Sequence, residues 1–447
     1  MKPSWPPSGM ELPNLPYLFT SNLIPISSIS TMGHPIAALI GQILLTAITA
    51  GFTHGDSPLR VLGLLPMALA VPYYVQTASS IPNLFQANFG GAQAVLALYQ
   101  YLDVVLINKW DFRFHGPMPK APEKKRETEN GRSLPNNGPR NGGSFLQRLQ
   151  FGFYAAASFR KSGTPFETHG VSPFKMSDPA YEPSSWRYTL GAALRFATCY
   201  LVLDALTSLG DAEDLAVLFA EAKQPLFSRM HEMGPKDFAE RVVTTVMFWT
   251  VLFLVLSTWI AFVSFLGVGL GLLSVSWWKP PFNVMAGHGL PYSIRRFWSH
   301  FWHKIVTDRI HQPSMFICDK VLRLRRGSLL RRYGTLALTF FFSMGFHAAG
   351  DIAGGIPPGK TGAPFFFFVQ VLAIVAEDLV QWVWKTLFAA SESATSPPAA
   401  WQKWVGRIWV FSFFVWSTPF FAYPMNLNNG DGLIVPFSVM RWIKAKL

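Results

Sequence analysis

The sequence predicts an all-α fold, a polytopic transmembrane bundle of about eight helices. Of its 447 residues, 50% are hydrophobic and only 14% are charged, whereas a soluble domain carries about 25% charged residues. Long uncharged stretches alternate with short polar loops, as in a helical membrane protein. The 39 Phe and 16 Trp residues suit lipid contact and interfacial belts. Because the apolar runs are continuous rather than alternating, we do not expect a β-barrel.

The apolar segments have the length that a helix needs to cross a bilayer. Pro66 and Pro72 predict a kink in the second segment. The fifth is longer than one span requires, so we expect it to be tilted, bent near residues 267–271, or broken. The segments are residues 35–52, 61–77, 90–107, 188–209, 242–273, 335–350, 364–387 and 405–423.

Two basic regions set the expected orientation. Residues 279–332 hold eleven Lys or Arg against two acidic residues, and residues 109–187 are also basic. The positive-inside rule places both in the cytosol and the N-terminus in the lumen. This bias and anionic lipid headgroups account for the net charge of +13, and no recognition motif indicates nucleic-acid binding. The expected parts are a lumenal segment 1–32, three helices in 33–108, a basic loop 109–187, middle helices in 188–278, a basic motif loop 279–333, and C-terminal helices in 334–447.

The first basic loop has two contrasting parts. Residues 121–143 are charged, rich in Gly, Asn and Pro, and almost free of apolar side chains, so we expect them to be disordered. Residues 144–161 form an amphipathic stretch. It either lies on the membrane surface or packs on the rest of the protein, and the pattern does not separate these alternatives.

Several chemistries lack their motifs. Cys199 lies in an apolar segment and Cys318 in a basic loop, so neither a disulfide framework nor a cysteine zinc site is expected. His300 and His303 are three residues apart but have no carboxylate nearby, and we expect no metal site. There is no G-x-S-x-G elbow and no P-loop. The N-terminus lacks the basic-then-apolar pattern of a cleavable signal peptide.

A first cluster of candidate functional residues reads P-Y-S-I-R-R-F-W-S-H-F-W-H-K and ends at residue 304. A short helix would place Trp298 and Trp302 on one face, at positions i and i+4. Arg295 and Arg296 supply positive charge for a polyanion such as the phosphates of CoA. From the residues alone, an aromatic and basic helix that anchors at the membrane interface is an equally good interpretation.

A second cluster reads F-F-S-M-G-F-H-A-A-G-D and ends at Asp351. His347 is ionisable inside an apolar segment, where such a residue is costly and is a functional candidate by default. A buried histidine favours its neutral, proton-accepting form, which suits a general base. Asp351 is one helical turn further on and could orient the imidazole. The alternative is a structural histidine bonded to a neighbouring helix.

Other acidic residues also fall within apolar segments. A proton path through them would indicate a transporter. They are explained more simply as hydrogen-bond partners between helices or as interfacial residues. These residues are Asp103, Asp204, Glu377 and Asp378.

The two clusters, in this order, resemble the wax-synthase-like branch of the membrane-bound O-acyltransferases. That family shows a Pro-Pro-aromatic turn, then Ser-Leu-x-x-Phe-Trp-Gly-x-x-Trp-His, then Ser-Gly-x-x-His. The specific resemblance covers residues 277–351, with Ser299 in place of the usual Gly and Met344 inserted after the serine. The matching residues are Pro280, Pro281, Phe282, Ser293, Ile294, Phe297, Trp298, Trp302, His303, Ser343, Gly345 and His347.

The resemblance implies an acyl-CoA donor, a hydroxyl acceptor and direct transfer between them, with no bound cofactor and no metal. It implies that His347 is the catalytic histidine and His303 the second polar residue of the active-site tunnel. With Asp351, these two residues form the expected catalytic group. The expected substrate-binding residues are Ser293, Arg296, Phe297, Trp298, Trp302, Ser343 and Gly345.

The resemblance extends to fungal members that acetylate terpenoid or other secondary-metabolite alcohols. We therefore expect acetyl transfer from acetyl-CoA to a hydrophobic alcohol, by a multi-pass protein of the endoplasmic reticulum membrane. A wax synthase that esterifies long-chain alcohols differs only in its substrates. A transporter or a non-catalytic membrane scaffold is the alternative of another class, and for it the intramembrane acids would matter and His347 would not.

Overall fold

The computed structural model describes residues 34–113, 116, 143–208, 210–282, 289–388, 398–430 and 432–446. Within these ranges every regular element is a helix, which confirms the predicted all-α class. The expected lumenal segment 1–32 and nearly all of the stretch 121–143 lie outside the described residues.

The N-terminal helices pack against one another and against α5 (Phe145–Ala157). Gly152 of α5 allows a close approach to α1, because a Cβ added there would lie 1.9 Å from the carbonyl oxygen of Ala47. Phe151 and Ala155 are fully buried, so the inner face of α5 packs on the protein. The other helices of this group are α1 (Ile36–Phe52), α2 (Leu59–Leu62), α3 (Leu64–Thr77) and α4 (Leu84–Tyr101), and α4 continues into a π-helical turn, η3 (Leu102–Ile107).

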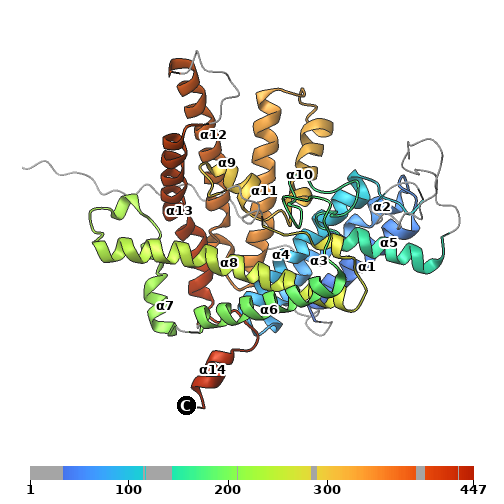
Figure 1. Cartoon of the computed structure of the whole chain (residues 1–447), viewed down its shortest axis with the longest axis horizontal. Coiled ribbons are helices and arrows are strands. Elements are labelled where there is room, and N and C mark those ends of the chain that lie inside the picture. The colour runs from blue at the N-terminus through green and yellow to red at the C-terminus, as the bar shows by residue number, and fades with distance from the viewer. Residues whose placement is uncertain are drawn as a thin grey trace, which may run out of the picture. The chain divides into compact units, whose positions relative to one another are not determined.

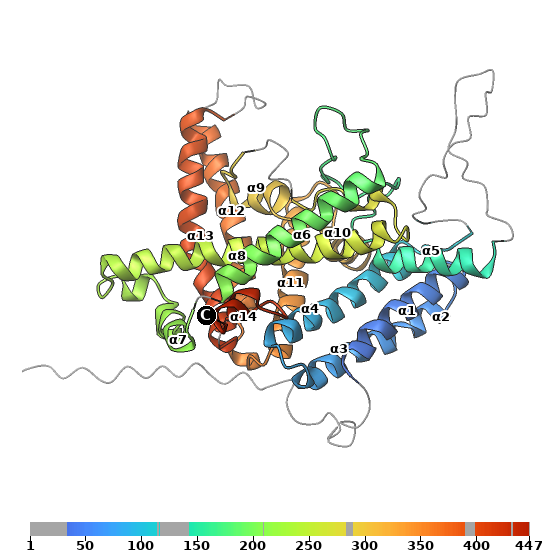
Figure 2. The same ribbon diagram turned by 60° about the horizontal axis from the view of Figure 1, so that its bottom comes forward.

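The longest helix, α8 (Pro235–Gly269), has 35 residues, and α6 (Ser185–Thr207) packs along it. It is unbroken and ends before Gly271, whose φ of +69° is a conformation that glycine adopts without strain. At about 1.5 Å per residue, α8 is far longer than the roughly 30 Å hydrocarbon core. In Figure 1, α6 and α8 run across the view and α12 and α13 run steeply to them, and the turned view of Figure 2 agrees. Of the three expected outcomes, a break within residues 235–269 is therefore excluded.

The C-terminal helices enclose an aromatic core. Its buried residues come from α8, the motif loop, α11, α12 and α13, and they include Phe248, Phe297, Phe366 and Phe421. The elements of this part are α9 (Ile294–Arg296), the π-helical turn η8 (Phe297–Phe301), α10 (Thr307–Phe316), the π-helical turn η9 (Ile317–Val321), α11 (Leu329–Ala353), α12 (Ala363–Phe388), α13 (Ala400–Asn428) and α14 (Val439–Lys444).

Each of the eight predicted apolar segments is a helix in the structure. Seven of the described helices are long and apolar enough to cross a membrane, and α1, with 17 residues, is slightly shorter. These seven are Leu59–Ser80, Leu84–Ile107, Ser185–Thr207, Pro235–Gly269, Leu329–Ala353, Pro358–Leu387 and Ala400–Asn428.

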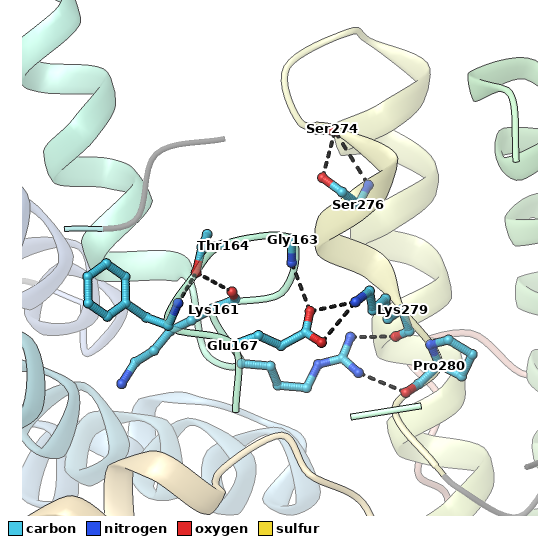
Figure 3. Close-up of polar contacts among 10 residues, drawn as sticks. Lys161, Gly163, Thr164, Glu167, Ser274, Ser276, Lys279 and Pro280 are labelled. Atoms are coloured by element: carbon cyan, nitrogen blue, oxygen red, sulfur yellow. Dashed lines mark hydrogen bonds and ion pairs between the residues drawn. The ribbon is translucent and has the colours of Figure 1, made fainter. Parts of the chain in front are cut away.

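The two basic loops contact each other. Arg160 donates hydrogen bonds to the carbonyl oxygens of Lys279 at 2.6 Å and Pro280 at 2.8 Å. The ammonium group of Lys279 lies 2.7 Å from the carboxylate of Glu167, which also accepts from the backbone N–H of Gly163 (Figure 3). Loops that bond to each other in this way must lie on one side of the membrane.

We predict that this side is the cytosol, because both loops carry the excess of Lys and Arg. A glycosylation site inserted into residues 121–142, or into the turn at 323–328, should remain unmodified. A site inserted into residues 210–234, between α6 and α8, should be glycosylated, and the mobility shift on removal of the sugar measures both. Glycosylation of the two basic loops but not of the 210–234 loop would reverse the orientation.

Candidate active site

The start of the motif loop is held by a carboxylate from α12. Glu377 accepts hydrogen bonds from the backbone N–H groups of Ile294 and of Arg295, at 3.2 Å for the latter, and from the indole of Trp409 at 2.9 Å. Ser293 caps the same helix end, since its hydroxyl accepts from the backbone N–H of Arg296 at 3.0 Å. The first N–H groups of a helix have no partner within the helix, so these acceptors fix where α9 begins.

The neighbouring acid, Asp378, ties the motif loop to α11. One of its oxygens lies 2.6 Å from the guanidinium of Arg295 and 2.8 Å from that of Arg332, and accepts from the hydroxyl of Tyr333 at 2.9 Å. Acidic residues in the other apolar segments also have local partners. Asp103 pairs with Lys161 at 2.8 Å, and Asp204 accepts from a backbone N–H of α14 at 3.0 Å. Each of these acids therefore has at least one structural partner.

The expected single helix through Trp298 and Trp302 is wrong. Helix α9 gives way to the π-helical turn η8, which closes with the backbone N–H of Trp302 donating to the carbonyl of Phe297 at 2.8 Å. Trp302 then has extended backbone, and its indole stacks on the ring of Phe297 at 5.8 Å. The π-helical turn and this stacking occur together in the motif loop. Both tryptophans nevertheless line one cavity, which also contains His303.

That cavity, the histidine cavity, brings together the two histidines of the sequence clusters. It measures about 120 Å³, and α4, α8, the motif loop and α11 to α13 form its walls. His347 projects from α11 into an aromatic cage, stacked on Phe367 at 4.9 Å and edge-on to Phe421 at 5.3 Å. The aromatic residues of its wall include Phe159, Trp249, Trp259, Trp298, Trp302, Phe346, Phe366, Phe367 and Phe421.

His303 lies at the end of the motif loop, with its ring 5.2 Å from that of Trp302. Its Nδ1 atom is buried and makes no hydrogen bond to the described residues. Burial lowers the pKa of His303 to about 3, and the positive charges of Arg160 and Lys304 add to the effect. At neutral pH the imidazole is therefore uncharged and able to exchange hydrogen bonds with a substrate.

The hydrogen bonds of Asp351 go to residues other than His347. Its two carboxylate oxygens accept from the amide of Asn88 at 3.2 Å and from the hydroxyl of Thr361 at 2.6 Å. The i+4 spacing places the two side chains on one face of α11, but α4 and the loop before α12 supply closer donors. Asp351 is thus bonded to Asn88, which lines the histidine cavity, and the expected hydrogen bond to the imidazole is not formed.

Five of the seven expected substrate-binding residues lie outside the histidine cavity. Ser293 is the helix cap described above. The guanidinium of Arg296 lies over the ring of Tyr292, 4.7 Å from its centroid. At Gly345, an added Cβ would lie 2.8 Å from the hydroxyl oxygen of Tyr99, so this glycine allows α4 and α11 to approach closely. The remaining two are Phe297, in the aromatic core, and Ser343, which is buried in α11.

The sequence analysis missed Arg309 as a member of the cavity wall. Arg309 is buried on α10, and its position in a basic loop made it look like one of many surface cations. Burial lowers its pKa to about 9, against the opposing charge of Asp103, which leaves it cationic at neutral pH. In the described part of the chain, no three His, Cys, Asp or Glu residues come together as metal ligands.

Comparison with known proteins bears on the same segment. A profile of the membrane bound O-acyl transferase family matches residues 278–369, which contain both histidines. Acetyltransferase fsoF of Humicola fuscoatra is 28% identical over 430 residues, which is 91% of this chain and 100% of that protein. Acetyltransferase aurG of Calcarisporium arbuscula is 27% identical, over 87% of this chain and 92% of its own length.

Acetyltransferase pyr8 of Aspergillus fumigatus is 29% identical, over 94% of both chains. No solved structure matches the chain. The expected resemblance to the membrane-bound O-acyltransferases is confirmed, and the chain is a membrane acyltransferase.

The contribution of the hydrogen bonds between Glu377 and α9 can be tested by measuring stability. Glu377→Ala removes the acceptor of two backbone N–H groups and an indole N–H, and should cost about 2 kcal/mol or more in stability. Thermal unfolding in detergent measures the loss. Glu377→Gln, which keeps one acceptor oxygen, should lose less. The control is Glu221→Ala, whose exposed ion pair with Lys360 is worth about 1 kcal/mol at most. Equal unfolding temperatures for Glu377→Ala and this control would show that Glu377 does not stabilise the start of α9.

Proposed function

We propose that this membrane-bound acyltransferase transfers an acetyl group from acetyl-CoA to a hydroxyl of a hydrophobic small molecule such as a terpenoid, with His347 as the general base. The shared burial of His303 and His347 in one aromatic cavity carries the proposal. The names of the three relatives support acetyl as the transferred group. The endoplasmic reticulum membrane is the proposed location.

The proposed reaction is a direct transfer. His347 takes the proton from the acceptor hydroxyl while the oxygen attacks the thioester carbonyl carbon. The carbonyl electron pair moves onto its oxygen, and then returns as the carbon–sulfur bond breaks. The CoA thiolate leaves and takes the proton back from the imidazolium. Because the aromatic cage excludes water, the neutral imidazole is favoured at the start, and positioning of the two substrates supplies much of the rate gain.

A second cavity offers a place for the acceptor. This acceptor cavity measures about 220 Å³ and is lined mainly by apolar residues of α4, α6, α8 and α13. Asn426 and Asn428 add polar groups to it. Its wall shares six residues with the histidine cavity: Phe85, Asn88, Phe248, Leu252, Val255 and Met425. An alcohol in the acceptor cavity would need to pass only this shared wall to bring its hydroxyl to His347.

The donor would reach the histidines from the opposite end. Arg160 and Lys304 lie close enough to His303 to affect its charge, and both belong to the basic loops. A cytosolic, anionic CoA can bind at such loops while only its acyl thioester enters the apolar cavity. The site would therefore bring together a polar donor from the cytosol and an apolar acceptor from the membrane.

Purified protein in detergent or lipid should convert labelled acetyl-CoA and a panel of terpenoid alcohols into acetate esters. Long-chain acyl-CoA with fatty alcohols tests the wax-synthase alternative in the same assay. Esters formed only from long-chain donors would favour that alternative. An absence of ester from every donor, with folded protein, would favour a transporter or scaffold.

His347→Ala should lower turnover by roughly 10²- to 10⁴-fold, the usual contribution of a positioned general base. The protein should still insert into membranes, since removal of a polar group from a span eases insertion. His303→Ala should be less severe or should act mainly on substrate binding. Turnover is compared at equal amounts of folded protein. Wild-type turnover in well-folded His347→Ala protein would remove His347 from the mechanism.

The acceptor cavity can be filled from α8. Val251 lines the acceptor cavity but not the histidine cavity. Val251→Trp would fill the acceptor cavity and should raise the KM for the alcohol several-fold or more. The slow hydrolysis of acetyl-CoA without acceptor should change little. Val246→Trp is the matched control, because Val246 lies on the same helix and is 49% exposed. Equal KM values for the alcohol in the two variants would mean that the acceptor binds elsewhere.

A further inference from the structure

Arg309 is a buried cation with uncommitted hydrogen-bond donors in the histidine cavity. The residue is 2% exposed and lines the same cavity as His303 and His347. Its Nε and Nη2 atoms make no hydrogen bond to the described residues. Leaving the donors of a buried cation without acceptors is costly, and a ligand that supplies the acceptor would remove that cost.

Asp103, whose charge acts on Arg309, and Asp308, the preceding residue, are both bound to other groups. Asp103 lies 2.8 Å from the ammonium of Lys161 and accepts a hydrogen bond from Asn108. Asp308 lies 3.3 Å from the same ammonium and accepts from the hydroxyl of Thr168 at 2.8 Å. The attraction of Asp103 lessens the charge cost of burying Arg309, but it does not occupy the two free nitrogens.

The guanidinium lies over an aromatic ring. Its central carbon lies 3.5 Å from the ring centroid of Phe159. That ring is stacked in turn on the indole of Trp259, with centroids 6.3 Å apart and planes 13° apart. A guanidinium stacked on a ring directs its N–H groups sideways, in its own plane. The donors are therefore preoriented before any substrate binds, as electrostatic stabilisation of a transition state requires.

Three other donors of the cavity wall have partners. The indole N–H of Trp298 donates to Gln370 at 3.0 Å, and that of Trp249 to Thr418 at 3.0 Å. The amide of Asn88 donates to Asp351. His303 is neutral and so brings no net charge to the cavity. Among these groups Arg309 alone offers both a full positive charge and two unpaired N–H groups.

We infer that Arg309 binds the thioester carbonyl oxygen of the acyl donor and stabilises the negative charge that develops there during transfer. The inference rests on the proposed function. When the acceptor oxygen attacks, the carbonyl electron pair moves onto this oxygen, and Nε–H and Nη2–H donate to it. As the carbon–sulfur bond breaks, the pair returns to form the ester carbonyl and the thiolate leaves. Arg309 exchanges no proton in these steps.

Arg309→Gln should lower kcat by roughly 10²- to 10³-fold, the usual effect of removing an oxyanion donor. Arg309→Lys, which keeps the charge but not the planar pair of donors, should lie between Arg309→Gln and wild type. The decisive measurement uses S-ethyl-CoA, a thioether that has no carbonyl oxygen. Its affinity should be the same for wild type and Arg309→Gln, because the contact that the variant loses is to the carbonyl.

Arg60→Gln is the control for loss of a buried arginine. Arg60 is 1% exposed, bonds to Thr53 and to the carbonyls of Val105 and Trp110, and lines neither cavity. Its substitution should lower the amount of folded protein and leave kcat per folded molecule unchanged.

Two results would overturn the inference while the proposed function stands. One is a wild-type kcat in folded Arg309→Gln, which would make the residue structural. The other is weaker binding of S-ethyl-CoA by that variant, which would place Arg309 on another part of CoA. If wild-type protein forms no ester from any acyl-CoA, the proposed function itself fails.

Discussion

The site depends on the hydrogen bonds that the first backbone N–H groups of α9 donate to the carboxylate of Glu377. They fix the first residues of the motif loop against α12, and Asp378 extends the same attachment to α11. From that fixed start, the π-helical turn η8 carries Trp298 and Trp302 to the cavity and leaves His303 beside them. A carboxylate inside an apolar helix is expensive. Here it satisfies donors that would otherwise be buried without partners.

Polarity is graded across the two neighbouring cavities, which share part of their walls. Cations of the basic loops surround the end at His303, where Arg160 also bonds to the Pro280 turn and so joins the two loops. The acceptor cavity beyond Leu252 and Val255 is mainly apolar. In the proposed function the histidines lie where a charged donor from water and an apolar acceptor from lipid can meet. Neither substrate then has to cross into the phase that excludes it.

Periodicity and composition were enough to predict the helices, while the position of His347 in an apolar segment and the family resemblance singled out the two histidines. All eight apolar segments are helical. In hydrocarbon, a single segment can satisfy its backbone N–H and C=O groups internally only as a helix. The details of the site depend on contacts between segments that are distant in sequence. Asp351 bonds to Asn88, which lies 263 positions earlier, instead of to the histidine one turn away. In the sequence, Arg309 resembles the other cations of its loop, and only the structure shows that it is buried against Phe159. The pattern i, i+4 likewise could not reveal that a π-helical turn would accompany the packing of Phe297 on Trp302.

The central claim is that the acyl thioester sits between His303 and His347. A structure of the wild-type protein in lipid nanodiscs with S-ethyl-CoA bound tests it most directly. The sulfur should lie inside the histidine cavity, within contact distance of the His347 ring, with the nucleotide outside among the basic loops. Well-defined density for the analogue elsewhere, with the histidine cavity unaltered, would contradict the account.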